Sequence, residues 1–409
     1  MSAAAGGRAA DTARPLAAAH QKPAGAAEMH AVCLSYSFDP RLTTPDALLD
    51  RCDTLVGWAE AVKAAGARVT VVQRFGSDAE VVRNAIPYRF VRDPSWRSGS
   101  LLDRAPRLNQ AVLSAQPDIV HVNGQQFARQ ALLLKRLLRH RRKSAHIPIL
   151  LQDHKCFPPR RWINRRTLAP ALRRMDALSF ASRDLAEPWL KGGFLRPDQP
   201  ILELMEGSCD FSMRPQDAAR ARTGLSGSPL CLWVGRLEPH KDPLTVLRGF
   251  AQALPSMPDA RLAMVYGTET LLPEVRKWIA ENPGAGGLVT LLGQRPHPEL
   301  EDIFNSADIF LLGSNSEGSG YAVIEALACG VVPVVTNIPS FRVLTGEGTI
   351  GGLFPVGDAE ALALVLRGRY SAMHPGARAE VRAFFEMNFH WNAIGRAAVA
   401  AYQSLLTRA

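Results

Sequence analysis

Residues 311–336 have the sequence LLGSNSEGSGYAVIEALACGVVPVVT, and this stretch decides the fold. An apolar strand leads into a Gly/Ser-rich loop that holds Glu317. A helix is expected to begin near Ser319 or Gly320, to carry Glu325, and to stop at the glycine ahead of a Val-rich strand. This order of strand, helix and strand predicts a parallel βαβ unit.

The start of that helix predicts a ligand. A helix N-terminus offers unpaired N–H groups and about half a positive charge, which attract phosphate. Gly318 and Gly320 let a ligand approach the backbone closely. Glu317 and Glu325 cannot hold phosphate, but carboxylates accept hydrogen bonds from sugar hydroxyls. The stretch therefore predicts a sugar-nucleotide site, and the alternative is a buried βαβ unit with solvated acids.

Length and composition bound the class of protein. The 409 residues predict two to three domains of ordinary globular composition, with 47% hydrophobic and 21% charged residues. No apolar run reaches the ~18 residues of a membrane span. The six cysteines include no C-x-x-C pair, which favours reduced thiols in the cytoplasm over disulfides or a zinc site.

Charge and patterning divide the chain. Residues 1–28 are rich in Ala, Gly and Pro, and we expect a disordered tail that is not a secretory signal. Residues 29–205 hold 28 Lys and Arg against 16 Asp and Glu, or +12, whereas residues 206–409 hold 17 against 20, or −3. We expect a first lobe over 29–205, a second lobe with different partners over 206–385, and a C-terminal helix over 386–409 that packs back toward the first lobe.

Strands and helices alternate in both lobes. Buried strands are predicted at 30–37, 68–73, 117–124, 147–154, 175–182 and 200–206, and then at 230–236, 260–267, 289–293 and 307–314. Helical patterns separate most of them. The fold class is therefore α/β, with two Rossmann-like, doubly wound parallel-sheet lobes that face each other across a cleft.

A second motif, LWVGRLEPHKD (232–242), follows a predicted strand. Ligand groups gather past the carboxyl ends of parallel strands. Arg236 and Lys241 lie just past such an end, after Gly235. Two cations there can bind a diphosphate and stabilise it as a leaving group. A solvated basic turn is the alternative interpretation.

A third motif, DHK (153–155), ends a strand of the first lobe. His154 would point into the cleft and could donate to a sugar hydroxyl or move a proton. The alternative is a packed or capping histidine. His121 lies in the middle of a strand, and we expect it to be structural.

Two segments of the first lobe, 135–143 and 160–174, are basic with interleaved apolar residues. They predict peripheral attachment to anionic lipid or capture of an anionic acceptor. The alternative is a solvated helix face. No nucleic-acid module is recognisable, so we do not expect a nucleic-acid partner.

No metal or cofactor is expected. The patterns D-x-D, HExxH and GxxxxGK[ST] are absent from the chain. Phosphate neutralisation is therefore left to Arg236, Lys241 and the helix start.

GRLEPHKD followed by SEGSGYAVIEALACGVVPVV resembles the retaining glycosyltransferases of GT-B architecture, family 4, also called glycosyl transferases group 1. Glu317 and Glu325 match that family's E-x7-E. LELMEGSCD, LLGQRPHPELEDIFNSADIFL and FHWNAIGRAAVAAYQSLL also resemble family segments. The likeness is strong over 200–409 and weak before it.

The resemblance implies a nucleoside diphosphate sugar as donor, a carbohydrate or lipid-linked acceptor, and retention of anomeric configuration without a metal. It also implies that the lobe over 206–385 binds the nucleotide sugar and that the lobe over 29–205 binds the acceptor. By position, the implied donor-binding residues are Gly235, Arg236, Lys241, Glu317, Gly318, Gly320, Tyr321 and Glu325. Arg236 and Lys241 would bind the diphosphate, Glu317 the donor sugar, and Glu325 the ribose. His154 resembles the front-lobe histidine, which places it with Arg236, Lys241 and Glu317 among the implied catalytic residues.

The chain departs from the family in two places: SYSFDPRLTT (35–44) stands in place of a Gly-Gly loop, and Tyr321 replaces the more usual Phe or Leu. Three functions remain open. The first is a retaining transferase of cell-envelope polysaccharide or glycolipid synthesis. The second is a sugar-nucleotide epimerase or hydrolase of the same fold, and the third is a glycosyltransferase-like binding protein without turnover.

Overall fold

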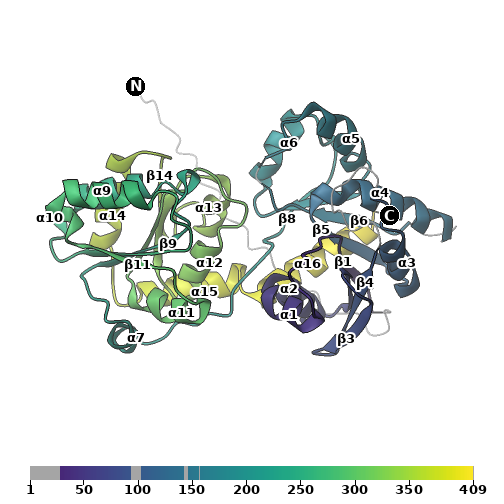
Figure 1. The fold of residues 1–409 in the computed structure, drawn as a ribbon, viewed down its shortest axis with the longest axis horizontal. Helices are drawn as coiled ribbons and strands as arrows, with labels where there is room; N and C mark the ends of the chain where they lie inside the picture. Colours follow the sequence, from purple (N-terminus) through teal and green to yellow (C-terminus); the bar gives the residue numbers. More distant parts are fainter. Residues whose placement is uncertain (1–27, 94–102, 142–145, 156, 409) are drawn as a thin grey trace, which may run out of the picture.

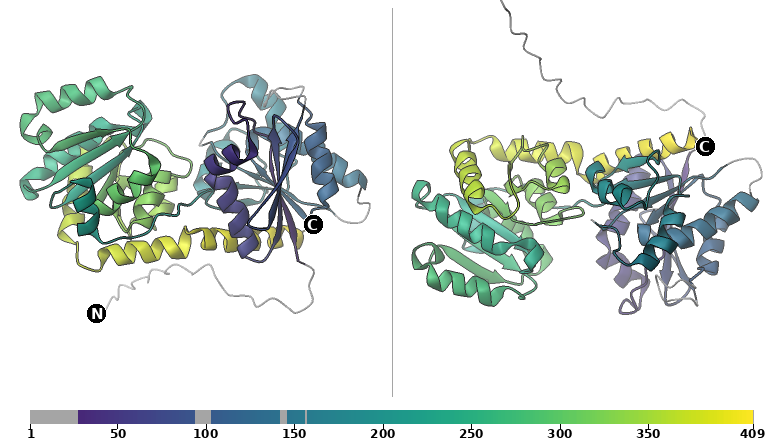
Figure 2. Two further views of the ribbon diagram at one scale, coloured as in Figure 1. Left: turned by 60° about the horizontal axis from the view of Figure 1, so that its bottom comes forward. Right: turned by 90° about the horizontal axis from the view of Figure 1, so that it is seen from above.

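The computed structural model describes residues 28–93, 103–141, 146–155 and 157–408, so the predicted tail lies outside it apart from Glu28. Two lobes are each built on one sheet with helices on both faces (Figures 1 and 2). Within these residues the first sheet has eight strands and the second has six. The predicted α/β class with two doubly wound lobes is confirmed.

The first sheet is formed by buried runs rich in Val, Leu and Ile. Its spatial order is β3-β4-β2-β1-β5-β6-β7-β8. The strands are β1 (His30–Ser35), β2 (Arg68–Phe75), β3 (Ala79–Arg83), β4 (Ile86–Arg92), β5 (Ile119–Asn123), β6 (Ile149–Gln152), β7 (Ala177–Phe180) and β8 (Ile201–Glu203). Parallel strands covered on both faces need continuously apolar sequences, which is why β1 is buried at every position.

The strand β3 was not predicted, and it alone runs antiparallel to its neighbour, β4, in the described part of this sheet. Its turn consists of Asn84 and Ala85, whose φ angles are 52° and 54°. Two residues with positive φ form the primed turn that suits a two-residue hairpin. Because Ala occupies a position where Gly is usual, the sequence carried no clear hairpin signal.

The helices of the first lobe cover both faces of its sheet. They are α1 (Pro45–Arg51), α2 (Asp53–Ala64), α3 (Pro106–Ala115), α4 (Ala128–Arg141), α5 (Trp162–Leu172) and α6 (Glu187–Lys191). Helices α4 and α5 pack against each other. Helix α1 ends and α2 begins around Cys52. Its ψ of 61° lies outside the helical range.

The second sheet is entirely parallel within the described residues. Its strands are β9 (Leu230–Gly235), β10 (Arg261–Tyr266), β11 (Val289–Gly293), β12 (Ile309–Leu312), β13 (Val332–Thr336) and β14 (Gly352–Phe354). Their spatial order is β11-β10-β9-β12-β13-β14. The chain winds outward in one direction from β9 and in the other from β12. The switch point of the sheet therefore lies between these two strands, where open α/β sheets bind ligands.

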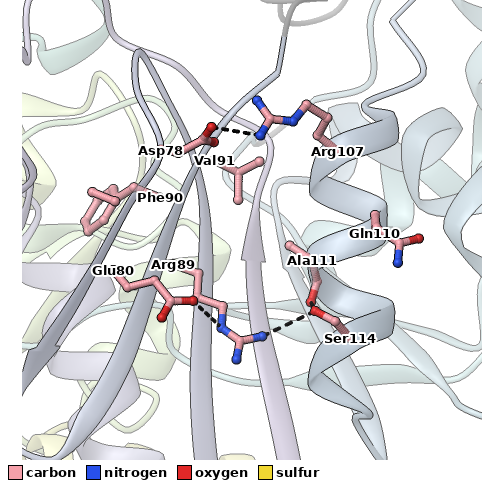
Figure 3. A pocket seen from close by; sticks show the side chains of 10 residues that line it. Asp78, Glu80, Arg89, Phe90, Val91, Arg107, Gln110, Ala111 and Ser114 are labelled. Atoms are coloured by element: carbon pink, nitrogen blue, oxygen red, sulfur yellow. Dashed lines mark hydrogen bonds and ion pairs between the residues drawn. The ribbon is translucent and has the colours of Figure 1, made fainter.

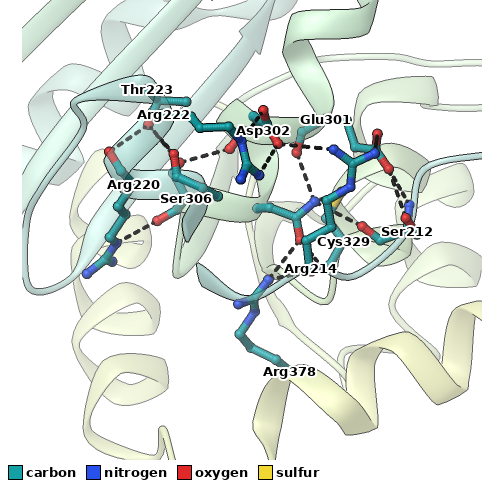
Figure 4. Close-up of polar contacts among 12 residues, drawn as sticks. Ser212, Arg214, Arg220, Arg222, Thr223, Glu301, Asp302, Ser306, Cys329 and Arg378 are labelled. Atoms are coloured by element: carbon teal, nitrogen blue, oxygen red, sulfur yellow. Dashed lines mark hydrogen bonds and ion pairs between the residues drawn. The ribbon is translucent and has the colours of Figure 1, made fainter. Parts of the chain in front are cut away.

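The second lobe contributes more helices. They are α7 (Gln216–Thr223), α8 (Pro243–Ala253), α9 (Leu272–Glu281), α10 (Pro283–Gly286), α11 (His297–Ser306), α12 (Tyr321–Ala328), α13 (Pro339–Leu344), α14 (Ala359–Ser371) and α15 (Ala377–Asn388), and α16 (Trp391–Leu406), which lies against the first lobe, follows them. An ion-pair network joins α7 and α11 through Arg222 and Asp302, 2.6 Å apart (Figure 4).

Two arginines of α15 hold the C-terminal end of α12. Arg378 Nη2 donates to the carbonyl oxygen of Cys329 at 2.9 Å, and Arg382 Nη1 donates to that of Ala328 at 2.6 Å (Figure 4 shows Arg378). The last carbonyls of a helix lack intrahelical partners and carry partial negative charge, so cations there are stabilising. At the opposite end of α12, no side chain caps the first turn.

The last helix, α16, packs against α2 of the first lobe, although α15 packs against α12 of the second (Figure 2). A Cβ on Gly395 would clash with the carbonyl oxygen of Ala61, so only glycine allows this close approach. The hydroxyl of Tyr402, also on α16, accepts from Trp58 Nε1 at 3.2 Å and lies 2.6 Å from His121 Nδ1.

Among the described residues, we find no helix with the length and apolar character that a membrane crossing requires. The described cysteines, Cys33, Cys52, Cys209, Cys231 and Cys329, form no disulfide with one another.

Candidate functional site

The helix α12 begins at the switch point of the second sheet, close to the predicted position. Gly320 is its N-cap with φ 73°, and no side chain caps the first turn. A Cβ on Gly320 would lie 2.7 Å from Phe341 Cε1, so the residue is glycine for its φ and for its packing. The first N–H groups of α12 are therefore available to an anion.

Lys241 and Glu317 meet beside this helix start. Their side chains form an ion pair, and 14% of each is exposed. Ser314 Oγ also donates to Glu317 Oε1 at 2.7 Å, and the N–H of Asn315 donates to the carbonyl of His240 at 2.8 Å. The loops that follow β9 and β12 are thus joined. A lysine ammonium has three N–H donors, so Lys241 can donate a hydrogen bond to a phosphate oxygen while it is paired with Glu317.

Arg236 lies further toward solvent, with 58% of its side chain exposed. Its Nη1 is 3.4 Å from Glu238 Oε1, and its Nη2 is 3.4 Å from His240 Nε2. Gly235 ends β9 immediately before it. Both predicted cations therefore follow the same strand, but Lys241 alone of the two contacts a predicted acid, Glu317.

Glu325 lies on α12, one turn inside the helix, and 12% of its side chain is exposed. Its Oε1 is 2.9 Å from His297 Nε2. His297 is in turn stacked on Phe211, with ring centroids 5.0 Å apart. A carboxylate that is held in place and is still partly exposed can accept hydrogen bonds from two adjacent hydroxyls of a ligand.

His154 connects the two lobes. Its Nδ1 pairs with one carboxylate oxygen of Glu206, whose other oxygen accepts from Ser319 Oγ in the loop before α12. Burial lowers the pKa of His154, but the hydrogen bond and charge of Glu206 outweigh this and raise the pKa above its usual value. Burial also raises the pKa of the neighbouring Asp153 to about 7.

Two family models match the chain. Glycosyl transferases group 1 matches residues 215–368, and Glycosyltransferase Family 4 matches residues 54–198. Together these segments take in most of both lobes. The chain belongs to the family 4, group 1 glycosyltransferases.

Relatives of this glycosyltransferase chain include two named D-inositol 3-phosphate glycosyltransferase. The protein of Mycobacterium avium (strain 104) is 31% identical over 215 residues, which are 50% of this chain and 50% of that protein. The protein of Acidothermus cellulolyticus is 30% identical over 251 residues, which are 56% and 55%. The aligned part thus spans about half the length of these relatives.

Solved structures share the GT-B fold over nearly the whole chain. A glycosyltransferase from Rickettsia africae has a TM-score of 0.68 at 16% identity and covers 94% of this chain and 100% of that one. Sucrose-phosphate synthase from Thermosynechococcus elongatus has a TM-score of 0.63 at 19% identity, with 93% and 100% covered. Anabaena HepE in complex with UDP has a TM-score of 0.66 at 18% identity, with 92% and 100% covered.

The loop in which this glycosyltransferase departs from the family is anchored by an aromatic residue. Tyr36 directly follows β1 and is fully buried. Its hydroxyl donates to Asn109 Oδ1 at 2.9 Å, and its ring lies 5.7 Å from that of Phe127. The first residues of 35–44 are therefore fixed by packing, which a Gly-Gly sequence could not provide.

A small cavity adjoins His154 and Glu206 at the carboxyl end of the first sheet. Gln152 and His121 also line it, and each has a buried nitrogen, Nε2, with no hydrogen-bond partner in the described residues. Burial lowers the pKa of His121 to about 3, so it is neutral at ordinary pH. Its Nδ1 is 2.6 Å from Tyr402, as expected of a structural role, while Nε2 stays available.

A larger pocket of about 640 Å³ lies elsewhere, between β3, β4 and α3 (Figure 3). Its charged side chains neutralise one another, with Arg107 2.7 Å from Asp78 and Arg89 3.2 Å from Glu80. None of the predicted site residues lines it. The larger cavity of the two thus lacks the predicted chemistry.

Sequence reasoning missed Glu206, Ser314, Ser319 and His297. Glu206 was visible as an acid near the expected boundary between the lobes, and that was the one available signal. Ser314, Ser319 and His297 contact the acids Glu317, Glu206 and Glu325, and these contacts depend on how the loops meet in the fold. Gly318 and Tyr321 lie beside this network: a Cβ on Gly318 would be 3.8 Å from Glu206 Oε1, and 41% of Tyr321 is exposed. No cluster of three potential metal-ligating side chains occurs among the described residues.

Proposed function

We propose that this chain is a retaining glycosyltransferase that moves a sugar from a nucleoside diphosphate sugar to an acceptor hydroxyl. The observation that carries the proposal is the pairing of Lys241 with Glu317 at the start of α12. A cation, a carboxylate and a row of free N–H groups there match a ligand made of phosphate and sugar hydroxyls.

Each residue then has a role in the proposed reaction. The N–H groups of Gly320 and Tyr321 and the ammonium of Lys241 bind the diphosphate, and Arg236 adds charge from the rim. Glu317 accepts from donor-sugar hydroxyls, and Glu325 accepts from ribose hydroxyls. Positive charge fixed at the leaving diphosphate stabilises the transition state more than the ground state.

The acceptor would bind to the first lobe beside His154. Its hydroxyl oxygen forms the new bond to the anomeric carbon on the face from which the diphosphate departs. The bond from that carbon to the phosphate oxygen breaks, and the hydroxyl proton passes to the phosphate. Gln152 and His121, whose Nε2 atoms lack partners in the described residues, offer hydrogen bonds to the acceptor.

The basic first lobe supports an anionic or lipid-linked acceptor, and with it a role in cell-envelope polysaccharide or glycolipid synthesis on the cytoplasmic side. The Anabaena HepE structures are described with UDP and with UDP-glucose, so uridine donors come first in any screen.

A thermal-shift panel of nucleoside diphosphate sugars tests the donor. A ligand at a hundredfold excess over its dissociation constant stabilises the native state by about 2.7 kcal/mol. We expect one donor to raise the Tm of the native chain and to leave Lys241→Ala unchanged. Equal shifts in both proteins would remove Lys241 from the site.

Product analysis separates the alternatives. Transfer to an acceptor with retained anomeric configuration, read by NMR, supports the proposal. Release of free sugar or of an isomer without an acceptor would instead indicate the hydrolase or epimerase function. A donor that binds without turnover would indicate the binding-protein alternative.

In this proposal, the side chains of Lys241 and Arg236 neutralise the diphosphate, which is a role that a metal ion has in other enzymes. We therefore expect an excess of EDTA to leave the rate of sugar transfer unchanged. A matched reaction with EDTA saturated by Mg²⁺ controls for effects of the chelator itself. Loss of transfer in EDTA and its recovery with Mg²⁺ would contradict the proposed role of Lys241 and Arg236.

A further inference from the structure

One part of the first lobe combines positive charge with an almost complete lack of acids. Between Gly124 and Met175 the sequence has 14 Lys and Arg but one acid, Asp153, which is buried. Among the described residues, no carboxylate lies within ion-pair distance of Arg161, Arg165 or Arg166. The charges of these three arginines are therefore available to an external partner, unlike that of Lys135, which lies 2.7 Å from Asp176.

Large apolar side chains are exposed in the same place. The exposed fractions are 61% for Phe157, 68% for Trp162 and 42% for Ile163. The guanidinium of Arg166 lies 5.3 Å from the ring centroid of Trp162. An exposed tryptophan among arginines is unlike a solvated helix face, which carries charge without large apolar groups.

Helix α5 explains this exposure. Its buried residues, Leu168, Ala169, Ala171 and Leu172, all lie in its second half and pack on the lobe. No described residue from 157 to 167 is buried, so the first half projects from the lobe. Helix α4 packs beside α5 and adds exposed Arg136 and Leu137.

We propose that the projecting side chains Phe157, Arg161, Trp162, Ile163, Arg165 and Arg166, here called the Trp162 surface, dock on an anionic lipid membrane. Tryptophan favours the boundary between headgroups and acyl chains, where its apolar ring and polar N–H are both satisfied. Arginines beside it are attracted by anionic headgroups. Charge complementarity thus selects an anionic membrane as the partner.

The chain also limits how far the Trp162 surface can lie from the proposed acceptor site. His154 and Trp162 are eight residues apart, a chain that spans at most about 28 Å when fully extended. A membrane docked here would hold lipid-linked acceptors near His154. This last point rests on the proposed function, whereas the docking itself needs neither donor nor acceptor.

Co-sedimentation of the full chain with vesicles tests the docking. We expect binding to phosphatidylglycerol vesicles at low salt, little binding to phosphatidylcholine vesicles, and weaker binding in high salt because counterions screen the headgroups. Binding to both lipids alike, or binding that salt does not change, would overturn the proposal. So would a preference for single-stranded RNA over vesicles.

Matched variants locate the surface. Arg165→Gln/Arg166→Gln should weaken vesicle partitioning about tenfold, because each basic residue near an anionic surface contributes to attraction. The control, Arg276→Gln/Lys277→Gln, removes two adjacent exposed cations from α9 in the other lobe. Equal weakening in both pairs would mean that net charge, and not this surface, determines binding.

The apolar part has its own control. Trp162→Ser/Ile163→Ser should also reduce binding, whereas Met387→Ser, an equally exposed apolar side chain on α15, should not. Thermal unfolding of each variant shows whether it is folded. Unchanged binding by folded Trp162→Ser/Ile163→Ser would overturn the role of the apolar residues. Donor binding by each variant is also measured by thermal shift. A variant that binds the donor as the wild-type protein does, but binds vesicles less, separates membrane docking from the proposed function.

Discussion

The two lobes of this glycosyltransferase use charge in different ways. In the second lobe, acids and bases are nearly balanced and meet one another, as Lys241 meets Glu317 and Glu325 meets His297. In the first lobe, cations exceed acids by 12, and several near α5 face solvent. Paired charges in half-buried loops suit a small ligand of defined shape, whereas unpaired cations on a projecting helix suit an extended anionic surface.

The largest effect is expected at Lys241. Replacing it by alanine removes the cation fixed beside the start of α12, and turnover should fall by about 10² or more, as for loss of a group that stabilises developing charge. Arg236→Ala should cost less, because its side chain is mostly exposed and its charge is screened. The measurement is kcat with a saturating donor.

Lys277→Ala, an exposed cation on α9 of the same lobe, is the control. Equal kcat values for Lys241→Ala and Lys277→Ala would mean that the ion-paired lysine matters no more than an exposed one. The contrast between paired charges in the second lobe and solvated charges in the first would then lose its main support.

The contact between the lobes gives the next effect. Glu206→Gln removes the charge that raises the pKa of His154, so this pKa should fall. The other titratable groups facing His154 are Asp153 and His121. The alkaline limb of the pH–kcat profile should then move to lower pH if protonated His154 donates to a substrate hydroxyl. NMR titration of His154 checks the pKa directly.

The same pKa shift affects stability with a defined sign. A histidine whose folded pKa is raised stabilises the fold below its unfolded pKa, about 6.5, and this stabilisation is lost as pH rises through the folded pKa. In Glu206→Gln, the free energy of unfolding should lack the part of its decrease above pH 6.5 that comes from the deprotonation of His154. An unaltered pH profile and an unaltered His154 titration would assign Glu206 a purely structural role.

A smaller effect is expected at Glu325. Glu325→Ala should raise the donor KM about tenfold with little change in kcat, because a carboxylate that binds ribose acts on ground state and transition state alike. Glu299→Ala, an exposed acid on α11, serves as the comparison. A fall in kcat at constant KM would instead place Glu325 at the reacting centre.

The smallest effect on activity belongs to the first lobe's contact with α16. Tyr402→Phe removes the hydroxyl that lies 2.6 Å from His121 Nδ1, and the free energy of unfolding should fall by about 1–2 kcal/mol. Turnover at saturating donor should hardly change. Tyr370→Phe, whose hydroxyl has one weak contact at 3.5 Å, should cost less. Equal Tm values for the two variants would show that the buried hydroxyl adds no stability.

The second lobe was the more predictable one because its signals are local. Gly320 was expected at the start of α12 and is its N-cap, since the glycines and the apolar helix lie in one short stretch. The pairs Glu206 with Ser319 and Glu325 with His297 join residues that are distant in sequence. Periodicity describes single elements, so it cannot give partners that depend on how loops meet.

The first lobe was harder to predict for a related reason. The β3–β4 hairpin turns through Asn84 and Ala85, a pair without the usual glycine. Tyr36 fixes the altered loop through Asn109, a residue on the unpredicted helix α3. The basic segments 135–143 and 160–174 were recognised from charge, although Arg142 and Lys143 lie outside the described residues. Which apolar side chains project among them became visible in the folded α5.

The chain crosses between the lobes twice, once after β8 and once between α15 and α16 (Figure 2). Two covalent crossings fix two points, and two points define a single line. Relative rotation of the lobes about that line stretches neither connection, whereas twisting or sliding would strain both. We therefore expect movement of one lobe against the other to be mainly a rotation about that line, one end of which lies near the contact of α16 with α2.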